Sequence, residues 1–243
     1  MKNGSEATPN GRERIYADVS IDERAGGWRI LLDGKPVLTP RRAELAVPAH
    51  GLAEALADEW RRQDERIDPR SMPLTKLANT ALDAVAPDMD AVMAGILGFA
   101  GRDLLCYRAV SPRDLTERQR LAWDPLLQWA DSQYGARLVA TEGIMPVEQP
   151  KQSLAALRSA FGGLDALGLT ALHVMTTLTG SAVLALAHIS GRLSLDDAWA
   201  AAHVDEDYQI RQWGEDYEAK RRREGHFAEM RAASEFYRLS RTR

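Results

Sequence analysis

A chain of 243 residues, 45% hydrophobic and 27% charged, has the composition of a globular protein rather than a disordered one. Its formal net charge of -4 gives no general reason to expect a nucleic-acid partner. The only cysteine, Cys106, excludes an intramolecular disulfide and a cysteine-rich zinc site, and its apolar neighbours predict a buried, unreactive thiol.

The first residues, 1–13, are polar and contain glycine and proline, which predicts a disordered tail. They lack the apolar core of a secretory signal, and Glu6 and the scarcity of arginine argue against a mitochondrial presequence. The longest apolar region, 164–189, is interrupted by glycine and histidine, which favours buried helices over a membrane span. We therefore expect a cytoplasmic protein that does not insert into membranes.

Apolar and polar residues alternate in the segment that follows the tail, as in half-buried strands. The pair Asp33-Gly34 is typical of a type I′ hairpin turn, which requires positive φ at both positions. Four short segments are expected to be strands of one β-meander: 14–21, 28–32, 35–38 and 44–47. We expect a small antiparallel β domain over residues 14–48, which must pack against something because so small a sheet is marginal alone.

After residue 48 the apolar residues repeat with helical spacing. Helices are predicted over 49–66, 74–83, 88–97, 116–134, 151–161, 164–178, 182–189 and 194–213. Two of these, 164–178 and 182–189, are apolar nearly all round and should lie at the centre of a bundle. The sequence therefore predicts an α+β protein with a small N-terminal antiparallel β domain and a larger all-helical domain over residues 49–243.

The stretch from Ser194 to Lys220 combines helical apolar spacing with eight acidic residues. Ser194 and the two aspartates soon after it are typical of a helix start. The other acids could form a solvated helix face, an enzymatic or metal-binding cluster around Asp205, Glu206 and Asp207, or a surface that binds a partner. His203 three residues before Glu206 reverses the Glu-x-x-His order of carboxylate metal bundles and occurs only once.

Five blocks, taken together and in order, resemble one protein family. They are WRILLDGKPVLTP at 28–40, EWRRQ at 59–63, PLTKLANTALD at 73–83, DLLCYRA at 103–109 and DEDYQIRQWGEDYEA at 205–219. The chain is similar to the F1-ATPase assembly chaperones specific for the ATPase α subunit, which are known from mitochondria and α-proteobacteria. The lack of a presequence makes it resemble the bacterial members.

The resemblance implies a small N-terminal β domain, a larger helical domain and a function without enzymatic activity. The protein would bind the unassembled α subunit, shield its subunit-facing surface and release it when the β subunit arrives. The resemblance also implies that there is no nucleotide or metal cofactor. We further expect a monomer without a nucleic-acid partner.

The resemblance singles out Trp60, in the EWRRQ block, as a residue whose substitution is harmful in the family. A tryptophan beside Leu56 on a helix face is equally suited to the core, so both roles stay open.

The resemblance also points to an acidic residue just after Trp213-Gly214, for which Glu215 and Glu218 are rival candidates. An apolar anchor next to charges suits a surface that binds reversibly, because the anchor supplies affinity and the charges supply selectivity. The exposed face of the small sheet around Tyr16 and Trp28 is a second candidate contact. The predicted partner-binding residues are Trp60, Trp213, Glu215, Asp216 and Glu218.

Overall fold

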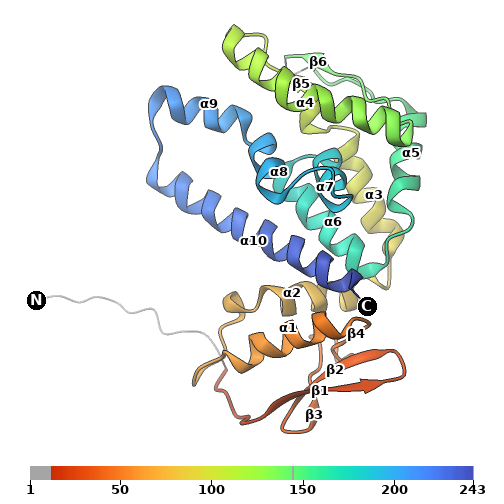
Figure 1. Cartoon of the computed structure of the whole chain (residues 1–243), viewed down its shortest axis with the longest axis vertical. Helices are drawn as coiled ribbons and strands as arrows, with labels where there is room; N and C mark the ends of the chain where they lie inside the picture. Colours follow the sequence, from red (N-terminus) through yellow and green to blue (C-terminus); the bar gives the residue numbers. More distant parts are fainter. Residues whose placement is uncertain (1–11, 144, 243) are drawn as a thin grey trace, which may run out of the picture. The chain divides into compact units, whose positions relative to one another are not determined.

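The structure is a computed structural model that describes residues 12–143 and 145–242 (Figure 1). Most of the tail predicted at 1–13 lies outside the described residues. Contacts group the chain into two compact units. The N-terminal unit comprises Met1–Ala84 with Arg238–Arg243, and the helical unit comprises Val85–Tyr237. The domain boundary expected at residue 48 stays a prediction about independently folding domains; the contacts themselves group the first two helices with the sheet.

The N-terminal unit contains the predicted antiparallel sheet, which together with the helices confirms the α+β class. Its strands are β1 (Val19–Arg24), β2 (Gly27–Leu32), β3 (Lys35–Pro36) and β4 (Ala46–Val47), with β2 paired to each of the others. Asp33 and Gly34 have φ of 47° and 75°, as the predicted hairpin turn requires. Gly27 lies so close to β4 that a Cβ there would sit 2.4 Å from the Val47 carbonyl oxygen.

Strand β1 begins at Val19 rather than at the predicted residue 14. The Asp33 carboxylate accepts hydrogen bonds from the backbone N–H of Ala17 (3.1 Å) and of Asp18 (2.8 Å), which ties this segment to the hairpin turn. Further back, the Arg14 N–H donates to the Glu65 carbonyl at 2.8 Å. These tertiary hydrogen bonds take the place of strand pairing.

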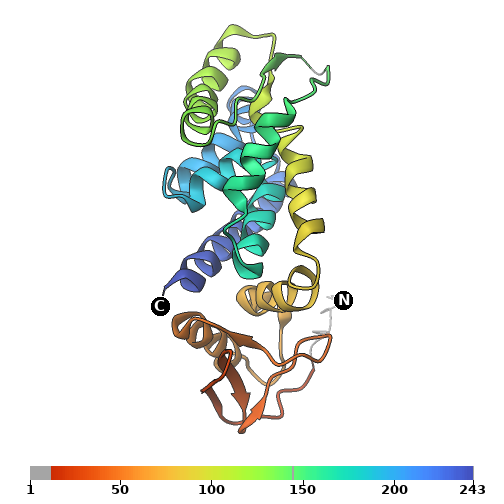
Figure 2. The same ribbon diagram turned by 90° about the vertical axis from the view of Figure 1, so that its right-hand side faces the viewer.

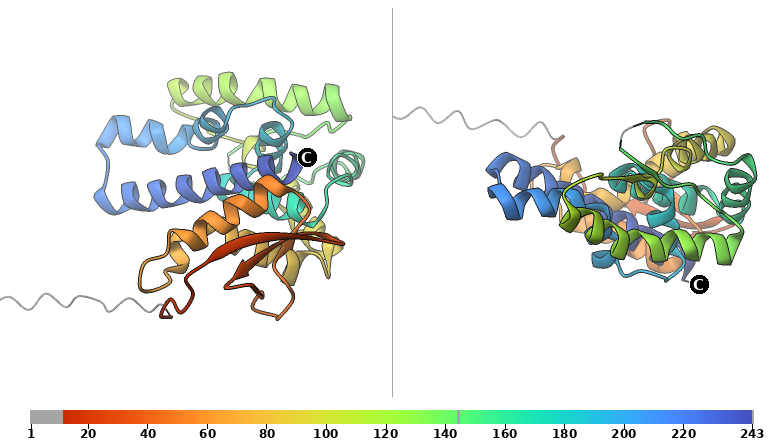
Figure 3. Two further views of the ribbon diagram at one scale, coloured as in Figure 1. Left: turned by 60° about the horizontal axis from the view of Figure 1, so that its bottom comes forward. Right: turned by 90° about the horizontal axis from the view of Figure 1, so that it is seen from above.

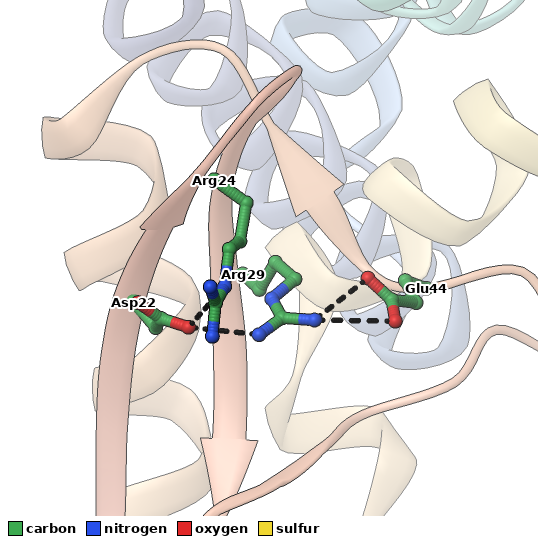
Figure 4. Close-up of polar contacts among 4 residues, drawn as sticks. All are labelled: Asp22, Arg24, Arg29 and Glu44. Carbon is green, nitrogen blue, oxygen red and sulfur yellow. Dashed lines mark hydrogen bonds and ion pairs between the residues drawn. The ribbon is translucent and has the colours of Figure 1, made fainter.

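The inner face of the sheet packs against helix α1 (His50–Arg61), and Ile30 and Leu52 are fully buried there. The exposed face carries an ionic network (Figure 4). In it, the Arg29 guanidinium contacts Asp22 at 2.8 Å and Glu44 at 3.1 Å. Because its side chains are charged, this face of the sheet is compatible with solvent and needs no further layer packed on it.

The expectation that Tyr16 and Trp28 mark the exposed face of the sheet is wrong, because neither residue lies on that face. Tyr16 is only 7% exposed, and its hydroxyl donates to the Trp60 carbonyl at 2.8 Å. The Trp28 ring packs edge-on against His50 of α1, with ring centres 4.5 Å apart. Both aromatic side chains therefore attach the sheet segment to α1.

The EWRRQ and PLTKLANTALD blocks form one structural unit. The first lies at the end of α1, and the second forms helix α2 (Pro73–Thr80) and the π-helical turn Ala81–Val85. Glu59 is buried, and its carboxylate accepts hydrogen bonds from the backbone N–H of Leu74 and Thr75 at 2.8 and 2.7 Å. Gln63 donates to the Ser71 hydroxyl and accepts from the Asp68 N–H, holding the connection between the helices.

The helical unit contains seven α-helices of the described chain and most of an eighth: α3 (Met89–Ala100), α4 (Arg113–Tyr134), α5 (Lys151–Phe161), α6 (Ala166–Thr179), α7 (Ala182–Ile189), α8 (Leu195–Ala202), α9 (Val204–Trp213) and, up to Tyr237, α10 (Tyr217–Arg241). Figure 2 shows α3 beside α5 and α6, which contact it. Most residues of α6 and α7 are buried, as their predicted central position requires. A short parallel pair, β5 (Tyr107–Arg108) and β6 (Thr141–Glu142), completes the unit.

Asp103 joins the DLLCYRA block to the start of α7. Its side chain is fully buried and accepts hydrogen bonds from the backbone N–H of Leu105 and Val183, both at 3.1 Å. Burial raises the pKa of this carboxyl to about 6. The thiol of Cys106 is buried, as predicted, and burial raises its pKa to about 12.

Among the described residues, no single helix is long and apolar enough to cross a membrane. Only the pair 73–85 and 89–106, on either side of a bend, meets the length and composition test when taken together.

Candidate functional site

The acidic stretch forms three separate helices rather than the single helix predicted over 194–213 and a charged end. Helix α8 starts at Ser194, whose hydroxyl accepts from the Asp197 N–H at 3.1 Å, as predicted. His203 has non-helical angles (φ -117°, ψ 22°) and separates α8 from α9. Helix α9 then runs outward to a turn, and α10 runs back from it (Figure 1, Figure 3). None of the α9 residues is buried.

The α9–α10 turn, which we define as residues 213–218, has a simple local origin. Gly214 adopts φ 86° and ψ 170°, a conformation that is essentially restricted to glycine, and it ends α9. The Asp216 carboxylate accepts from the Ala219 N–H at 2.9 Å and caps the start of α10. Asp216, one of the predicted partner-binding residues, therefore has a structural task in the turn itself.

Two large aromatic side chains of the turn face solvent. Trp213 is 78% exposed and Tyr217 is 71% exposed. A single exposed apolar side chain is ordinary, whereas two bulky exposed rings on one short turn are more typical of interaction sites. Tyr217 was not among the predicted contacts. Its position three residues after Gly214 is the feature of the sequence that could have indicated it.

The rival acids of the turn have different surroundings. Glu215 forms an ion pair with Lys220 at 3.1 Å, which raises the pKa of the lysine. Among the residues that the structure describes, Glu218 is exposed and has no hydrogen-bond or ion-pair partner. The carboxylate of Glu218 is therefore free to meet a cationic group of another molecule.

A cavity of about 230 Å³ lies between α9 and α10 behind the turn. Its lining includes Ile210 and Trp213 from α9, and Ala219, Lys220 and Arg223 from α10. The walls thus combine apolar and charged side chains, the composition expected of a small polar-rimmed recess in a protein interface.

Arg223 clamps α9 to α10. Its guanidinium lies 2.6 Å from the Asp207 carboxylate and 3.8 Å from that of Glu206. Glu206 also lies 3.7 Å from the ring of His203, whose pKa is lowered by burial. Arg223 was not among the residues singled out from the sequence.

Asp205 is likewise bonded inside the protein: it accepts from the side-chain amide of Gln119 on α4 at 2.6 Å. The same Gln119 accepts from the Ala109 N–H at 2.8 Å and is almost fully buried. Across residues 12–143 and 145–242, no group of three or more His, Cys, Asp or Glu side chains is placed to hold a metal ion. The acids at 205–207 thus form an internal polar network, and their geometry lends nothing to the enzymatic or metal-binding alternative.

Trp60 belongs to the N-terminal unit, whereas the other predicted partner-binding residues belong to the helical unit. Its side chain is half-buried, with the Tyr16 ring edge-on at 5.9 Å. These contacts give Trp60 a packing role, and its role in partner binding stays a prediction.

Comparison with known proteins gives a consistent result. The family model described as ATP12 chaperone protein matches residues 13–131. The crystal structure of Atp12 from Paracoccus denitrificans is 43% identical, with a TM-score of 0.90 over 94% of this chain and 98% of that chain. A variant of the Paracoccus protein with one aspartate replaced by lysine matches equally well.

A chaperone candidate from Agrobacterium tumefaciens is 46% identical, with a TM-score of 0.90 over 93% of this chain and 85% of that chain. These similarities extend well beyond the residues that the family model matches. They include the C-terminal half of the chain, which contains the α9–α10 turn. The chain therefore belongs to the ATP12 chaperone family of non-enzymatic F1-ATPase assembly factors, as the resemblance of its blocks had implied.

Proposed function

We propose that this protein binds the unassembled α subunit of F1-ATPase, shields the surface of that subunit that faces its neighbours, and hands it on during assembly. Membership of the family supports the choice of client. The observation that carries the proposed contact surface is the exposure of Trp213 and Tyr217 on the α9–α10 turn.

An unassembled subunit exposes apolar surface that its neighbours will later cover, so a chaperone for it needs apolar anchors of its own. Tryptophan and tyrosine are the residues most often found as such anchors, because they bury a large area at small entropic cost. A contact confined to a short turn is also small enough to be displaced by the incoming subunit. Trp213 is accordingly the main apolar anchor, and Tyr217 adds to the contact area.

The three acidic residues of the turn have different roles. Asp216 caps α10 and Glu215 pairs with Lys220, so both carboxylates are occupied within the protein. Because Glu218 has no such partner, we propose Glu218 rather than Glu215 as the charge that meets the client. Charges at the rim of an interface chiefly increase the association rate and the selectivity.

Capture of purified, unassembled α subunit by the immobilised protein tests this function. Trp213→Ala should weaken capture by about ten-fold or more, as truncation of a central aromatic anchor does. Val110→Ala is the matched control, because Val110 is 68% exposed in the same unit but lies outside the turn.

Glu218→Gln should weaken capture by about five-fold, mainly through slower association. Glu229→Gln is its control, since Glu229 is exposed on the same helix about three turns further along. If the unchanged protein captures no α subunit, the proposed client is wrong. If Trp213→Ala and Val110→Ala capture it equally well, the proposed surface is wrong.

A further inference from the structure

A second concave site lies in the N-terminal unit, and no residue of the α9–α10 turn lines it. It is a cavity of about 510 Å³ formed by the link at 40–41, the end of α1, the segment 67–72 and α2. Most of its wall is apolar, with Pro40, Ile67, Pro69, Met72 and Ala84 among the lining residues. Its volume is within the range of about 300–1,000 Å³ that is usual for ligand-binding pockets.

Two side chains of the wall carry buried polar atoms without a hydrogen-bond partner among the described residues. They are the indole Nε1 of Trp60, a donor, and the amide Oδ1 of Asn79, an acceptor. Buried polar atoms are nearly always paired, so two orphans on one cavity wall call for a partner. Both atoms are covered from solvent, and pairing with a ligand therefore requires these side chains to shift as it binds. The Thr75 hydroxyl also belongs to the wall. It interacts with the Glu59 carboxylate, so we do not count it as a third unpaired group.

The charged side chains at the rim of the cavity differ in whether they have a partner. The Asp83 carboxylate is occupied by the Thr39 hydroxyl at 2.6 Å and by the Arg41 N–H at 2.9 Å. The Arg41 guanidinium in turn donates to the Asp83 carbonyl at 2.7 Å. Lys76 is exposed, and within the described part of the chain its ammonium group has no partner. The rim therefore offers one free positive charge.

We propose that this cavity, which we call the Trp60 pocket, binds an extended segment of the client polypeptide. An apolar side chain of the segment fills the cavity, one of its peptide groups pairs with Trp60 and Asn79, and a neighbouring acidic side chain meets Lys76. A peptide group supplies both the carbonyl that the indole N–H lacks and the N–H that the Asn79 oxygen lacks. The choice of a polypeptide, and of the α subunit in particular, rests on the proposed function.

Filling the pocket from its rim tests this proposal without altering the core. Ala84 is exposed and lines the cavity, so Ala84→Trp should occupy the space that the client side chain needs. Ala17 is exposed in the same unit and does not line the cavity, so Ala17→Trp is the matched control. Capture of purified α subunit should weaken at least ten-fold for Ala84→Trp and stay within two-fold for Ala17→Trp, as order-of-magnitude expectations.

A gain-of-signal experiment does not depend on tolerance of a bulky substitution. The photoreactive residue p-benzoylphenylalanine placed at Thr80, which is exposed and lines the cavity, should cross-link to the α subunit on illumination. The same residue placed at Ala17 should not. Lys76→Glu should weaken capture more than Lys35→Glu, which changes an exposed lysine elsewhere in the unit.

The outcomes separate the two proposals. Loss of capture with Ala84→Trp together with cross-linking from position 80 supports the Trp60 pocket. Normal capture by Ala84→Trp, with no cross-link from position 80, overturns the pocket and leaves the client and the α9–α10 turn intact. Failure of the unchanged protein to capture the α subunit overturns the proposed function, and the occupant of the pocket with it.

Discussion

The carboxylate of Glu59 in α1 accepts a hydrogen bond of 2.7 Å from the backbone N–H of Thr75 and so caps α2. Its second oxygen accepts from the Leu74 N–H at 2.8 Å. The start of α2 contains no acidic residue and has no cap of its own. A side chain from the preceding helix therefore satisfies the free amide groups of the next one.

Glu59→Ala should destabilise the N-terminal unit by about 2–4 kcal/mol, because it leaves two buried N–H groups without acceptors. Glu59→Gln should cost about half as much, since its amide keeps one acceptor oxygen. Glu54→Ala removes an exposed ion pair with Arg61 and should change stability by less than about 1 kcal/mol. Urea unfolding followed by circular dichroism measures all three, and equal costs for Glu59→Ala and Glu54→Ala would refute the capping role.

The buried Asp103 predicts a distinct pH dependence of stability. Its pKa is about 6 in the folded protein, against an ordinary value of 3.8 for an exposed aspartate. Between these values the folded chain holds a proton that the unfolded chain has lost, so stability falls as the pH rises through this window. The contribution is about 3 kcal/mol at most, from about two pKa units.

Asp103→Asn isolates this contribution, because asparagine does not titrate. The variant should be less stable at every pH, since its amide cannot accept all the hydrogen bonds of the carboxylate. The loss of stability between pH 4 and pH 7 should nevertheless be smaller in the variant than in the unchanged protein. Denaturant unfolding at several pH values measures the difference, and parallel curves would contradict the raised pKa.

The Arg223 clamp predicts local mobility of α9. Because α9 has no buried residue, its attachment depends on polar contacts such as the one between Arg223 and Asp207. Arg223→Ala should speed hydrogen exchange in residues 204–213 by about ten-fold and leave α6 and α7 unchanged. Arg222→Ala, an exposed neighbour, is the control. Exchange measured by mass spectrometry would refute the clamp if both variants behaved alike.

Gly214 and Gly225 offer a matched pair of alanine substitutions. Gly214→Ala places a side chain at φ 86° and ψ 170° and should cost about 1–3 kcal/mol or distort the turn. Gly225 lies within α10 with nothing within 4 Å of an added Cβ, so Gly225→Ala should stabilise by about 0.5–1 kcal/mol. Thermal unfolding gives the signs, and capture of the α subunit should fall only for Gly214→Ala. A neutral effect at both positions would show that the turn tolerates other conformations.

Local signals in the sequence predicted much of the fold. The Asp33-Gly34 turn and the apolar pair of helices at the centre were recognisable, because turn chemistry and hydrophobic periodicity act over short distances. The break between α8 and α9 carries no glycine or proline. At this break the His203 ring lies 3.9 Å from the Trp199 ring, and Nδ1 contacts the Trp199 carbonyl at 2.8 Å. A break without glycine or proline is not visible in the periodicity of a sequence.

Helix α10 shows the same limit from the other side. Its charged sequence hid an apolar spacing in which Met230, Ala233 and Phe236 are fully buried. For the candidate site, the sequence indicated the right turn but not the division of roles among its acidic residues. That division depends on Asp216 meeting the Ala219 N–H and on Glu215 meeting Lys220, and the sequence alone left open whether an acid faces solvent or its own helix.

The close approach of Gly27 to the Val47 carbonyl sets a limit on sequence variation in the sheet. Any side chain at position 27 would collide with backbone, which cannot rotate away as a neighbouring side chain can. Gly163 has open space around it and ordinary backbone angles. A library randomised at both positions and selected for folded protein should return glycine at 27 and many residue types at 163.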